Sequence, residues 1–344
     1  MNYSTKNVLS LLSVATASLL FLGCGDKKES TDDTPKGTPT AETVTVQSIL
    51  PIKKTGQTIS YNNQGVEVHD NSLKDDAYYQ TGTSSNFTRV ADVVTDELTG
   101  FMWQDNLEAA IITKPMVTKE NYNNADYNNT SGDTATTYCS SLTLGGYSDW
   151  SIPTRSELES ILDYSGSYPA IYPIFKNTKM SHYWSSTLSG FTTGVSSNNG
   201  TSSKITSIYG GVWIDSRKSY SNYIRCVRNT QATPNNTSSL TWEKDTSADR
   251  KNFEEAVGYC NSLTLKGNSE WRLPSINELA VLIDDKTEGI QILNSFGKSY
   301  PNQYWSSSTE VRSPERALLV SFGNGYINSN TKTSELYVKC VREQ

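Results

Sequence analysis

Apolar positions near residue 255 follow the period of a helix. The apolar face of this predicted helix consists of Phe253, Ala256, Val257 and Cys260. A second helix is predicted after Pro274, because Ser275 and Glu278 have the spacing of a capping box, in which each side chain bonds the main chain of the other residue. The buried face of this second helix would contain Leu279, Leu282 and Ile283.

Beyond the second helix the pattern changes to the alternation that is typical of strands. Three segments have it in each half of the chain: a YWSS segment, a later segment ending in VWI or VSF, and a terminal segment ending in CVR. In the terminal segment Ile224 and Cys226 share one face. In the middle segment Trp213 is aligned with Phe322. The pattern predicts an α+β fold, with two helices packed on a small, mainly antiparallel sheet.

These elements occur twice because the chain contains an internal duplication. Residues 138–158 match residues 259–279 at 12 of 21 positions. Six of the seven tryptophans form equivalent pairs: Trp103 with Trp242, Trp150 with Trp271, and Trp184 with Trp305. We therefore predict copy one at residues 49–229, including an N-terminal extension, a linker at 230–238, and copy two at 239–344.

The cysteines follow the same duplication. Cys139 and Cys226 lie in copy one, and Cys260 and Cys340 lie at the matching positions of copy two. In an oxidising compartment we expect Cys139–Cys226 and Cys260–Cys340 bonds, each joining the first helix to the last strand. The two other pairings would link the copies, and free buried thiols are the remaining alternative. Closing loops of this length stabilises the fold by about 4 kcal/mol per bond.

The N-terminus has the pattern of a lipoprotein signal peptide. Lys6 precedes an apolar stretch, residues 8–22, which is too short for a confident membrane span. The stretch ends in Gly23-Cys24, which resembles a lipobox. We predict a signal peptide at residues 1–23 and a lipid on Cys24 that anchors the protein in a membrane. Ordinary secretory cleavage and a retained anchor are the alternatives.

A tether is predicted between the lipid and the folded part. Residues 24–48 are polar and rich in Thr, Asp and Lys, so they bury too little surface to fold and are expected to be disordered. Gly25 stands where an aspartate would signal retention in the inner membrane. The expected location is therefore the cell envelope, at the outer membrane, either periplasmic or exposed at the surface.

The net charge and the histidine content limit the kinds of partner and metal ion that we expect the protein to bind. A net charge of −6 argues against a nucleic-acid partner. The two histidines, His69 and His182, form no metal-binding motif. Residues 126–133 resemble a calcium loop only in their first turn. We predict no metal site and no cofactor.

Two sets of charged residues invite a functional interpretation. Glu157 and Glu278 are paired carboxylates, but their place in the capping boxes favours a structural role over acid–base chemistry. Four cations recur around the last strand, and we favour structural contacts over an anion-binding patch. These cations are Arg225, Arg228, Lys339 and Arg342.

Copy one differs from copy two by a long segment before Cys139, residues 107–132, which we call the excursion, and by a polar loop at 195–203. Long loops on a rigid scaffold are where binding residues concentrate. Aromatic side chains are the expected ligand contacts there, because their faces stack on sugar rings. The candidate ligand-binding residues are Phe191, Tyr209, Trp213, Tyr220 and Tyr223.

Several segments together resemble the Lcl C-terminal domain family over about 290 residues. They are an opening at 54–61, DDAYYQTG at 75–82, VTDELTGFMW at 94–103, WRLPSINEL at 271–279, and the closing KCVR at 339–342. Copy two lacks the opening. The resemblance implies two tandem domains with a C-type-lectin-like fold, distantly similar to formylglycine-generating enzymes.

The resemblance also implies an exported binding or adhesion module. The founding member is a collagen-like adhesin that binds sulfated glycosaminoglycans through basic surfaces, whereas this chain is acidic and has no collagen repeat. The predicted function is a lipid-anchored recognition module that binds a glycan, a matrix component or a protein. The alternative is a structural or assembly lipoprotein. We do not expect an enzyme, because all four domain cysteines are assigned to bonds rather than to an oxidase site.

Overall fold

The computed structural model describes residues 42–166, 170–188, 202–207, 211–229, 238–245, 249–283, 295–296, 300 and 302–344. Residues Ala41–Gln344 form one compact unit. The predicted signal peptide, Cys24 and most of the predicted linker lie outside the described residues. No described helix is both long and apolar enough to cross a bilayer.

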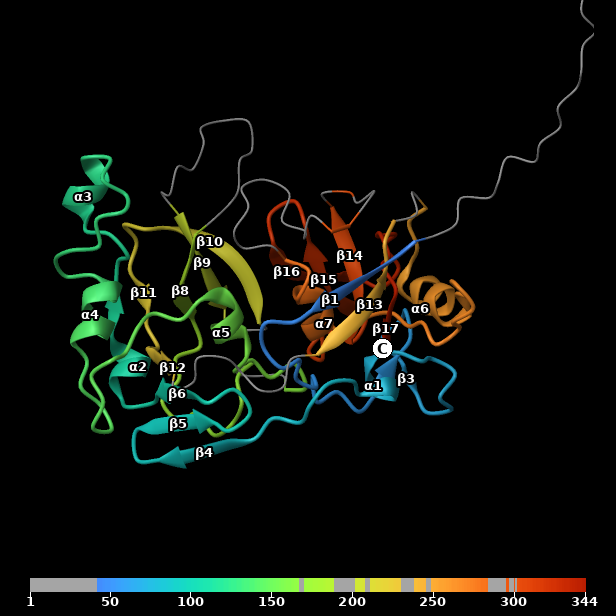
Figure 1. Cartoon of the computed structure of the whole chain (residues 1–344), viewed down its shortest axis with the longest axis horizontal. Helices are drawn as coiled ribbons and strands as arrows, with labels where there is room; N and C mark the ends of the chain where they lie inside the picture. The colour runs from blue at the N-terminus through green and yellow to red at the C-terminus, as the bar shows by residue number, and fades with distance from the viewer. Residues whose placement is uncertain are drawn as a thin grey trace, which may run out of the picture. The chain divides into compact units, whose positions relative to one another are not determined.

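Copy one is built from small sheets and short helices (Figure 1). Its strands are β4 (Phe87–Val90), β5 (Val93–Asp96), β6 (Phe101–Gln104), β7 (Thr113–Lys114), β8 (His182–Leu188), β9 (Ser202–Ser207), β10 (Val212–Arg217), β11 (Asn222–Tyr223) and β12 (Val227–Asn229). Its helices are α2 (Glu108–Ile111), α3 (Lys119–Asn123), α4 (Ala135–Ser141) and α5 (Arg155–Glu159). The strands form two sheets, in the orders β4-β5-β6-β12 and β10-β9-β8-β11-β7.

Copy two repeats this plan with fewer elements. It contains β13 (Ser239–Glu243), α6 (Phe253–Ser262), α7 (Ile276–Ala280), β14 (Gln303–Thr309), β15 (Arg316–Ser321), β16 (Tyr326–Thr331) and β17 (Val341–Glu343). The strand pairs among these elements are antiparallel, and a parallel bridge joins Tyr304 to Tyr337, as the parallel pair of β8 with β11 joins Tyr183 to Tyr223 in copy one. The predicted mixed α/β fold with small antiparallel sheets is confirmed.

The helices begin where the sequence pattern placed them, but α7 ends at Ala280, so the buried Leu282 and Ile283 follow the helix rather than lie on its face. α6 buries Phe253, Ala256, Val257 and Cys260. α5 and α7 both begin with complete capping boxes, formed by Thr154 with Glu157 and by Ser275 with Glu278.

The paired tryptophans keep the same contacts in both copies. The indole N–H of Trp184 donates to the carbonyl of Lys114, and that of its counterpart Trp305 donates to the carbonyl of Lys251. Trp103 and Trp242 are both fully buried. The duplication therefore preserves hydrogen bonds as well as residue types.

Trp213 does not correspond to Phe322, contrary to the sequence alignment. Trp213 lies in β10 opposite Thr206, and the residue in the same place of β16 is Ile327, opposite Val320. Phe322 follows β15 instead. The length difference between the copies lies between β8 and β9, and from there to the second cysteine the spacing is equal: Trp213 and Ile327 each lie 13 residues before it.

The N-terminal segment, residues 42–84, forms what we call the strap. It contains β1 (Thr43–Gln47), β2 (Ser60–Tyr61), β3 (Glu67–Val68) and α1 (Asp76–Tyr79). β1 pairs with β13 of copy two, placing Val44 opposite Trp242, as β5 places Val94 opposite Trp103 in copy one. The tether predicted to extend to residue 48 therefore ends earlier, because the strap supplies a strand that copy two lacks.

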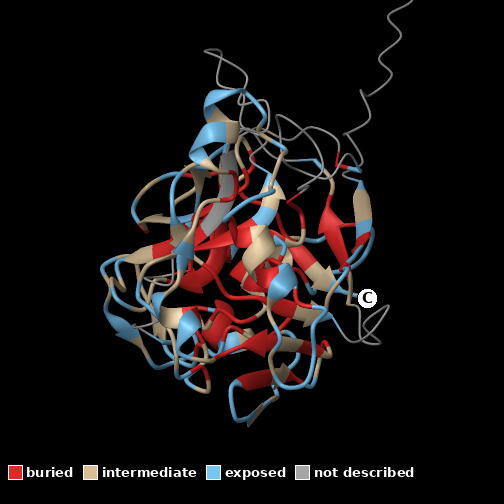
Figure 2. Ribbon diagram, turned by 90° about the vertical axis from the view of Figure 1, so that its left-hand side faces the viewer, coloured by how far each residue is buried: buried red, intermediate tan, exposed pale blue. Residues whose placement is uncertain are grey.

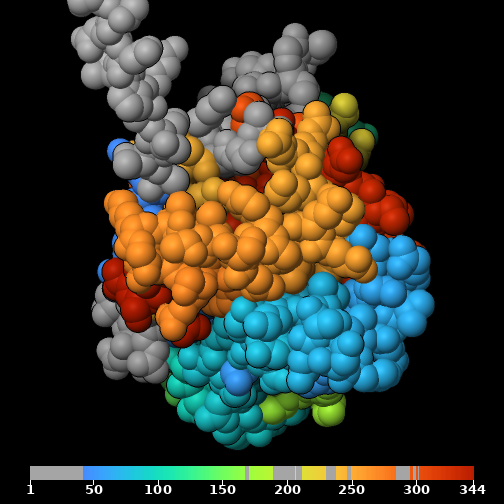
Figure 3. Space-filling view, turned by 90° about the vertical axis from the view of Figure 1, so that its right-hand side faces the viewer, coloured from blue at the N-terminus to red at the C-terminus, as the bar shows by residue number. Residues whose placement is uncertain are grey.

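The rest of the strap also packs on copy two, although the sequence assigned it to copy one. The Gln57 side chain exchanges two hydrogen bonds with the main chain of Thr309, at 2.7 and 2.9 Å. A Cβ on Gly65, which has φ +76°, would lie 2.8 Å from the amide nitrogen of Glu315. The cyan surface of the strap lies directly against the orange surface of copy two (Figure 3).

One hydrophobic core joins the strap and both copies. It contains Val46 from the strap, Leu158 from copy one and Leu279 from copy two. β10 lies beside β16, where Tyr326 hydrogen-bonds Asp215 across the boundary between the copies. Seen from the copy-one side, the buried segments lie in the middle and exposed segments surround them (Figure 2). The two copies are therefore parts of one folded unit.

Candidate functional site

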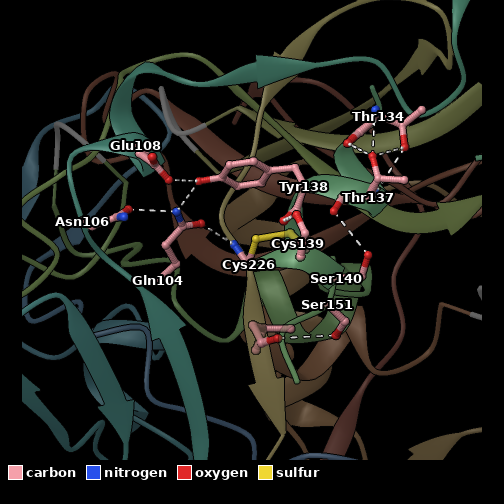
Figure 4. The surroundings of a disulfide bond; sticks show 12 residues. Gln104, Asn106, Glu108, Thr134, Thr137, Tyr138, Cys139, Ser140, Ser151 and Cys226 are labelled. Atoms are coloured by element: carbon pink, nitrogen blue, oxygen red, sulfur yellow. Dashed lines mark hydrogen bonds between the residues drawn. A yellow bond between two sulfur atoms is a disulfide. The ribbon is translucent and has the colours of Figure 1, made fainter. Parts of the chain in front are cut away.

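Both predicted disulfides are present, Cys139–Cys226 and Cys260–Cys340. Each joins the first long helix of its copy to the residue just before the last strand. Beside the first bond, Gln104 accepts a hydrogen bond from the Cys226 amide and donates one to the Tyr138 hydroxyl at 2.7 Å (Figure 4). The Tyr138 hydroxyl donates in turn to Glu108. Burial raises the pKa of Tyr138, so its hydroxyl remains protonated.

Copy two has an acid where copy one has an amide. Glu243 stands at the position of Gln104, accepts from the Cys340 amide at 3.4 Å and accepts from the Tyr259 hydroxyl at 2.8 Å. Burial raises the pKa of Glu243. Both residues accept from the cysteine amide and bond the tyrosine hydroxyl, although the bond to the tyrosine runs in opposite directions. This shared arrangement indicates that the network supports the disulfide and the last strand.

The cations around the last strand make structural contacts. Arg225 is buried and donates to Asp105 at 2.9 Å, and Lys339 is buried and donates to the main chain of residue 244 at 2.8 Å. Arg228 pairs with Asp149 at the surface. These cations do not line one accessible anion-binding surface.

The paired glutamates also act within the fold. Glu278 caps α7 and forms two hydrogen bonds with Arg272, both 2.7 Å long. Burial raises the pKa of Glu278, but the attraction of Arg272 outweighs it and holds that pKa below its ordinary value. A buried carboxylate that stays ionised beside an arginine is not available as a proton donor.

The candidate ligand-binding residues that the structure describes differ in how far their side chains are exposed. Phe191 and Tyr209 lie outside the described residues. Trp213 is fully buried, so the prediction that it contacts a ligand is corrected: its strand turns the indole into the core shared by the copies. Tyr223 is half-buried against Tyr183, with ring centres 5.7 Å apart. Among the described candidates, Tyr220 alone exposes most of its side chain, 57%.

The excursion of copy one fixes the loop that carries Tyr220. This loop joins β10 to β11, and β11 pairs with β7 from the excursion. The carbonyl of Lys218 accepts hydrogen bonds from the amides of Met116 and Val117. The buried Lys218 ammonium donates to the carbonyl of Tyr127 at 2.9 Å, and burial lowers its pKa. The loop is thus held from two sides.

The matching loop of copy two has no aromatic tip. Lys332 occupies the position of Lys218, is also buried, and donates to the carbonyl of Tyr61 at 2.6 Å. Tyr61 belongs to the strap, so the strap covers copy two where the excursion covers copy one. Ser334 stands where copy one has Tyr220. Neither lysine was predicted as a site residue, although each lies at the same distance before the second cysteine of its copy.

The segment resembling a calcium loop makes other contacts. Asp126 accepts a hydrogen bond from Asn129, and Asp133 pairs with Lys114 at 2.6 Å. Across the described ranges no group of three or more His, Cys, Asp or Glu side chains is placed to hold a metal ion.

The fold and these contacts define a tandem, disulfide-bonded α/β protein with a framework of buried ion pairs and capped helices. The family model of the Lcl C-terminal domain matches residues 92–228 and 231–342, so the chain belongs to this family and contains two tandem copies of its domain. The strap lies before the first matched segment. No curated protein matches the chain.

Proposed function

We propose that the protein is an exported, lipid-anchored recognition module and that Tyr220 in copy one is the centre of its ligand-binding surface. The observation that supports this proposal most directly is that Tyr220 is exposed on a loop held by the excursion. Membership of the Lcl C-terminal domain family supports a location outside the cytoplasm. A lipid on Cys24 and the polar residues that follow it would hold the folded unit away from a membrane.

The chemistry around Tyr220 suits a neutral glycan. The guanidinium of Arg217 lies 6.0 Å from the ring centre of Tyr220, which leaves the opposite ring face for a sugar. Asn222 supplies an amide near the same loop, bonded to the Ser216 hydroxyl. Because the excursion fixes this loop, ligand binding need not order it, and that saves entropy. The protein is acidic, so we expect neither nucleic acid nor a polyanion as partner.

The test is a glycan and matrix-protein array probed with the chain from Gly25 onward. The Tyr220→Ser variant, which installs the residue of copy two, should weaken a hit by about tenfold, which corresponds to about 1.4 kcal/mol for the lost stacking contact. Tyr78→Ser is the matched control, because Tyr78 is an exposed tyrosine on the strap. Binding that survives Tyr220→Ser unchanged would rule out this surface.

Two further measurements complete the test. Stacking on a neutral sugar predicts weak salt dependence, whereas binding through cations would weaken as salt screens them. Mass spectrometry of the mature protein should find a lipid on Cys24, and an unmodified N-terminus would exclude the anchor. An array without hits is the result expected of the alternative, a structural or assembly lipoprotein.

A further inference from the structure

A cavity of about 410 Å³ lies where the two copies and the strap meet. α5 of copy one forms one wall and α7 of copy two forms another, and residues 47–53 of the strap pass between them (Figure 1). Cavities of this size at the junction of domains are typical small-molecule sites. This cavity is separate from the Tyr220 loop.

Equivalent positions of the duplication face each other across the cavity. Ser156 of α5 corresponds to Asn277 of α7, and Glu159 corresponds to Ala280. Just beyond the helices, Ser160 corresponds to Val281. The cavity therefore lies between the two copies of one helix. The lining residues of the copy in α5 differ from those of the copy in α7.

The two walls differ in polarity. The copy-one wall is mostly polar, with Ser156 and Ser160 beside one apolar residue, Leu162. The copy-two wall is mostly apolar and consists of Ala280, Val281, Ile283 and Asn277, whose amide donates to the carbonyl of Lys53 at 2.8 Å. The strap adds four consecutive apolar residues, 49–52, to the apolar side. Of these four residues Ile49 is the most exposed, at 75%.

The charges at the cavity are neutralised within the protein. Arg155 pairs with Glu159 at 2.5 Å. Lys53 pairs with Asp96 at 2.7 Å, and both of these residues are buried. A charged ligand would have to compete with these pairs, whereas an uncharged ligand would not.

We propose that this cavity binds an uncharged amphiphile. Its apolar body lies against Val281, Ala280 and the apolar residues of the strap, and its polar group reaches the serine hydroxyls of α5. The Ser156 hydroxyl can donate and accept hydrogen bonds, and the Ser160 hydroxyl, which already donates to the carbonyl of Glu157 at 2.7 Å, can accept one, so the two together suit an alcohol, ester or amide. The strap closes one side of the site, which gives the same segment that completes copy two a second role.

The test uses N-phenyl-1-naphthylamine, an uncharged fluorophore that brightens in apolar surroundings, with the chain from Gly25 onward, which contains the compact unit. Saturable binding of one probe per chain is expected. Ser156→Trp fills the cavity from the polar wall and should raise the Kd at least about tenfold. Ser140→Trp, at an exposed serine of α4, is the matched control and should leave the Kd unchanged.

A second pair of variants helps to distinguish loss of binding from loss of folding. Val281→Asp places a charge on the apolar wall and should also raise the Kd, whereas Val90→Asp, at a valine that is 76% exposed on β4, should not. Circular dichroism and the Tm identify any variant that fails to fold. Absence of saturable binding to the wild type, or unchanged binding in folded Ser156→Trp and Val281→Asp proteins, overturns the proposal.

Competition with three compounds of equal chain length tests the charge argument. 1-Decanol should displace the probe at lower concentration than decanoate or decyltrimethylammonium. Equal or better displacement by either ion overturns the assignment of an uncharged ligand. The measurement involves no glycan, so its failure leaves the proposal for Tyr220 unaffected.

Discussion

Lys218 and Lys332 occupy equivalent positions in the two copies, and each buried ammonium donates a hydrogen bond to the main-chain carbonyl of a tyrosine. The two tyrosines come from unrelated parts of the chain: Tyr127 lies in the excursion of copy one, and Tyr61 lies in the strap. A buried ammonium requires such acceptors because its desolvation is costly. The duplicated core therefore needs a covering segment, and the chain supplies it in two different ways.

Replacing these lysines should destabilise the fold and, in one case, loosen the strap. Lys332→Met leaves the carbonyl of Tyr61 and the hydroxyl of Thr309 without their donor, which should cost about 1 to 3 kcal/mol. Urea denaturation measures this cost. Limited proteolysis should cut the strap faster in Lys332→Met than in the matched Lys218→Met variant. Equal protection of the strap in both variants would contradict its anchoring by Lys332.

The strand β1 offers a test with two neighbouring residues. Val46 is buried in the shared core and Thr45 is exposed on the opposite face of the strand. Val46→Asp should lower the free energy of unfolding by more than about 2 kcal/mol, because it buries an unpaired charge. Thr45→Asp should change it by less than about 0.5 kcal/mol. If both variants unfold at the wild-type urea concentration, β1 does not contribute to the core.

The strap should also make stability depend on pH. Asp76 is buried, and its carboxylate accepts hydrogen bonds from Thr55 at 2.7 Å and Ser308 at 2.5 Å. Burial, with the nearby charges of Glu278 and Asp75, raises the pKa of Asp76 from 3.8 to about 7. The folded protein then binds more protons than the unfolded chain between about pH 4 and pH 7.

It follows that stability should fall as the pH rises through this window, by at most about 1.4 kcal/mol per pH unit for one group. Burial raises the pKa of Asp75 to about 6, which adds to the effect below that pH. Asp76→Asn removes the titrating group and should flatten the slope measured by urea denaturation at several pH values. A slope that is the same in the wild type and in Asp76→Asn would refute this assignment.

Local features and the two disulfides could be predicted from the sequence, whereas the pairing of distant strands could not. The buried face of α6 and the capping boxes depend on residues a few positions apart, so the pattern around Phe253 and Glu278 was sufficient. The disulfides followed from the duplication. The partner of β1 depends on tertiary structure, because β13 lies about two hundred residues further along the chain. Trp213 was misjudged because alternation does not tell which face of a strand turns inward: in β10 the side chain of Trp213 is buried and that of Ile214 is exposed.

The position of the strap leads to a prediction for the separated copies. Residues 238–344 alone lack β1, which pairs with β13, and lack the acceptor that Tyr61 gives Lys332. We expect this fragment to unfold over a broad range of urea concentration and to show weak near-ultraviolet circular dichroism. Joining residues 42–84 to its N-terminus through a Gly/Ser linker should restore a cooperative transition. The same fusion carrying Val46→Asp is the control and should restore much less. A fragment 238–344 that unfolds cooperatively without the strap would show that copy two is an independent domain.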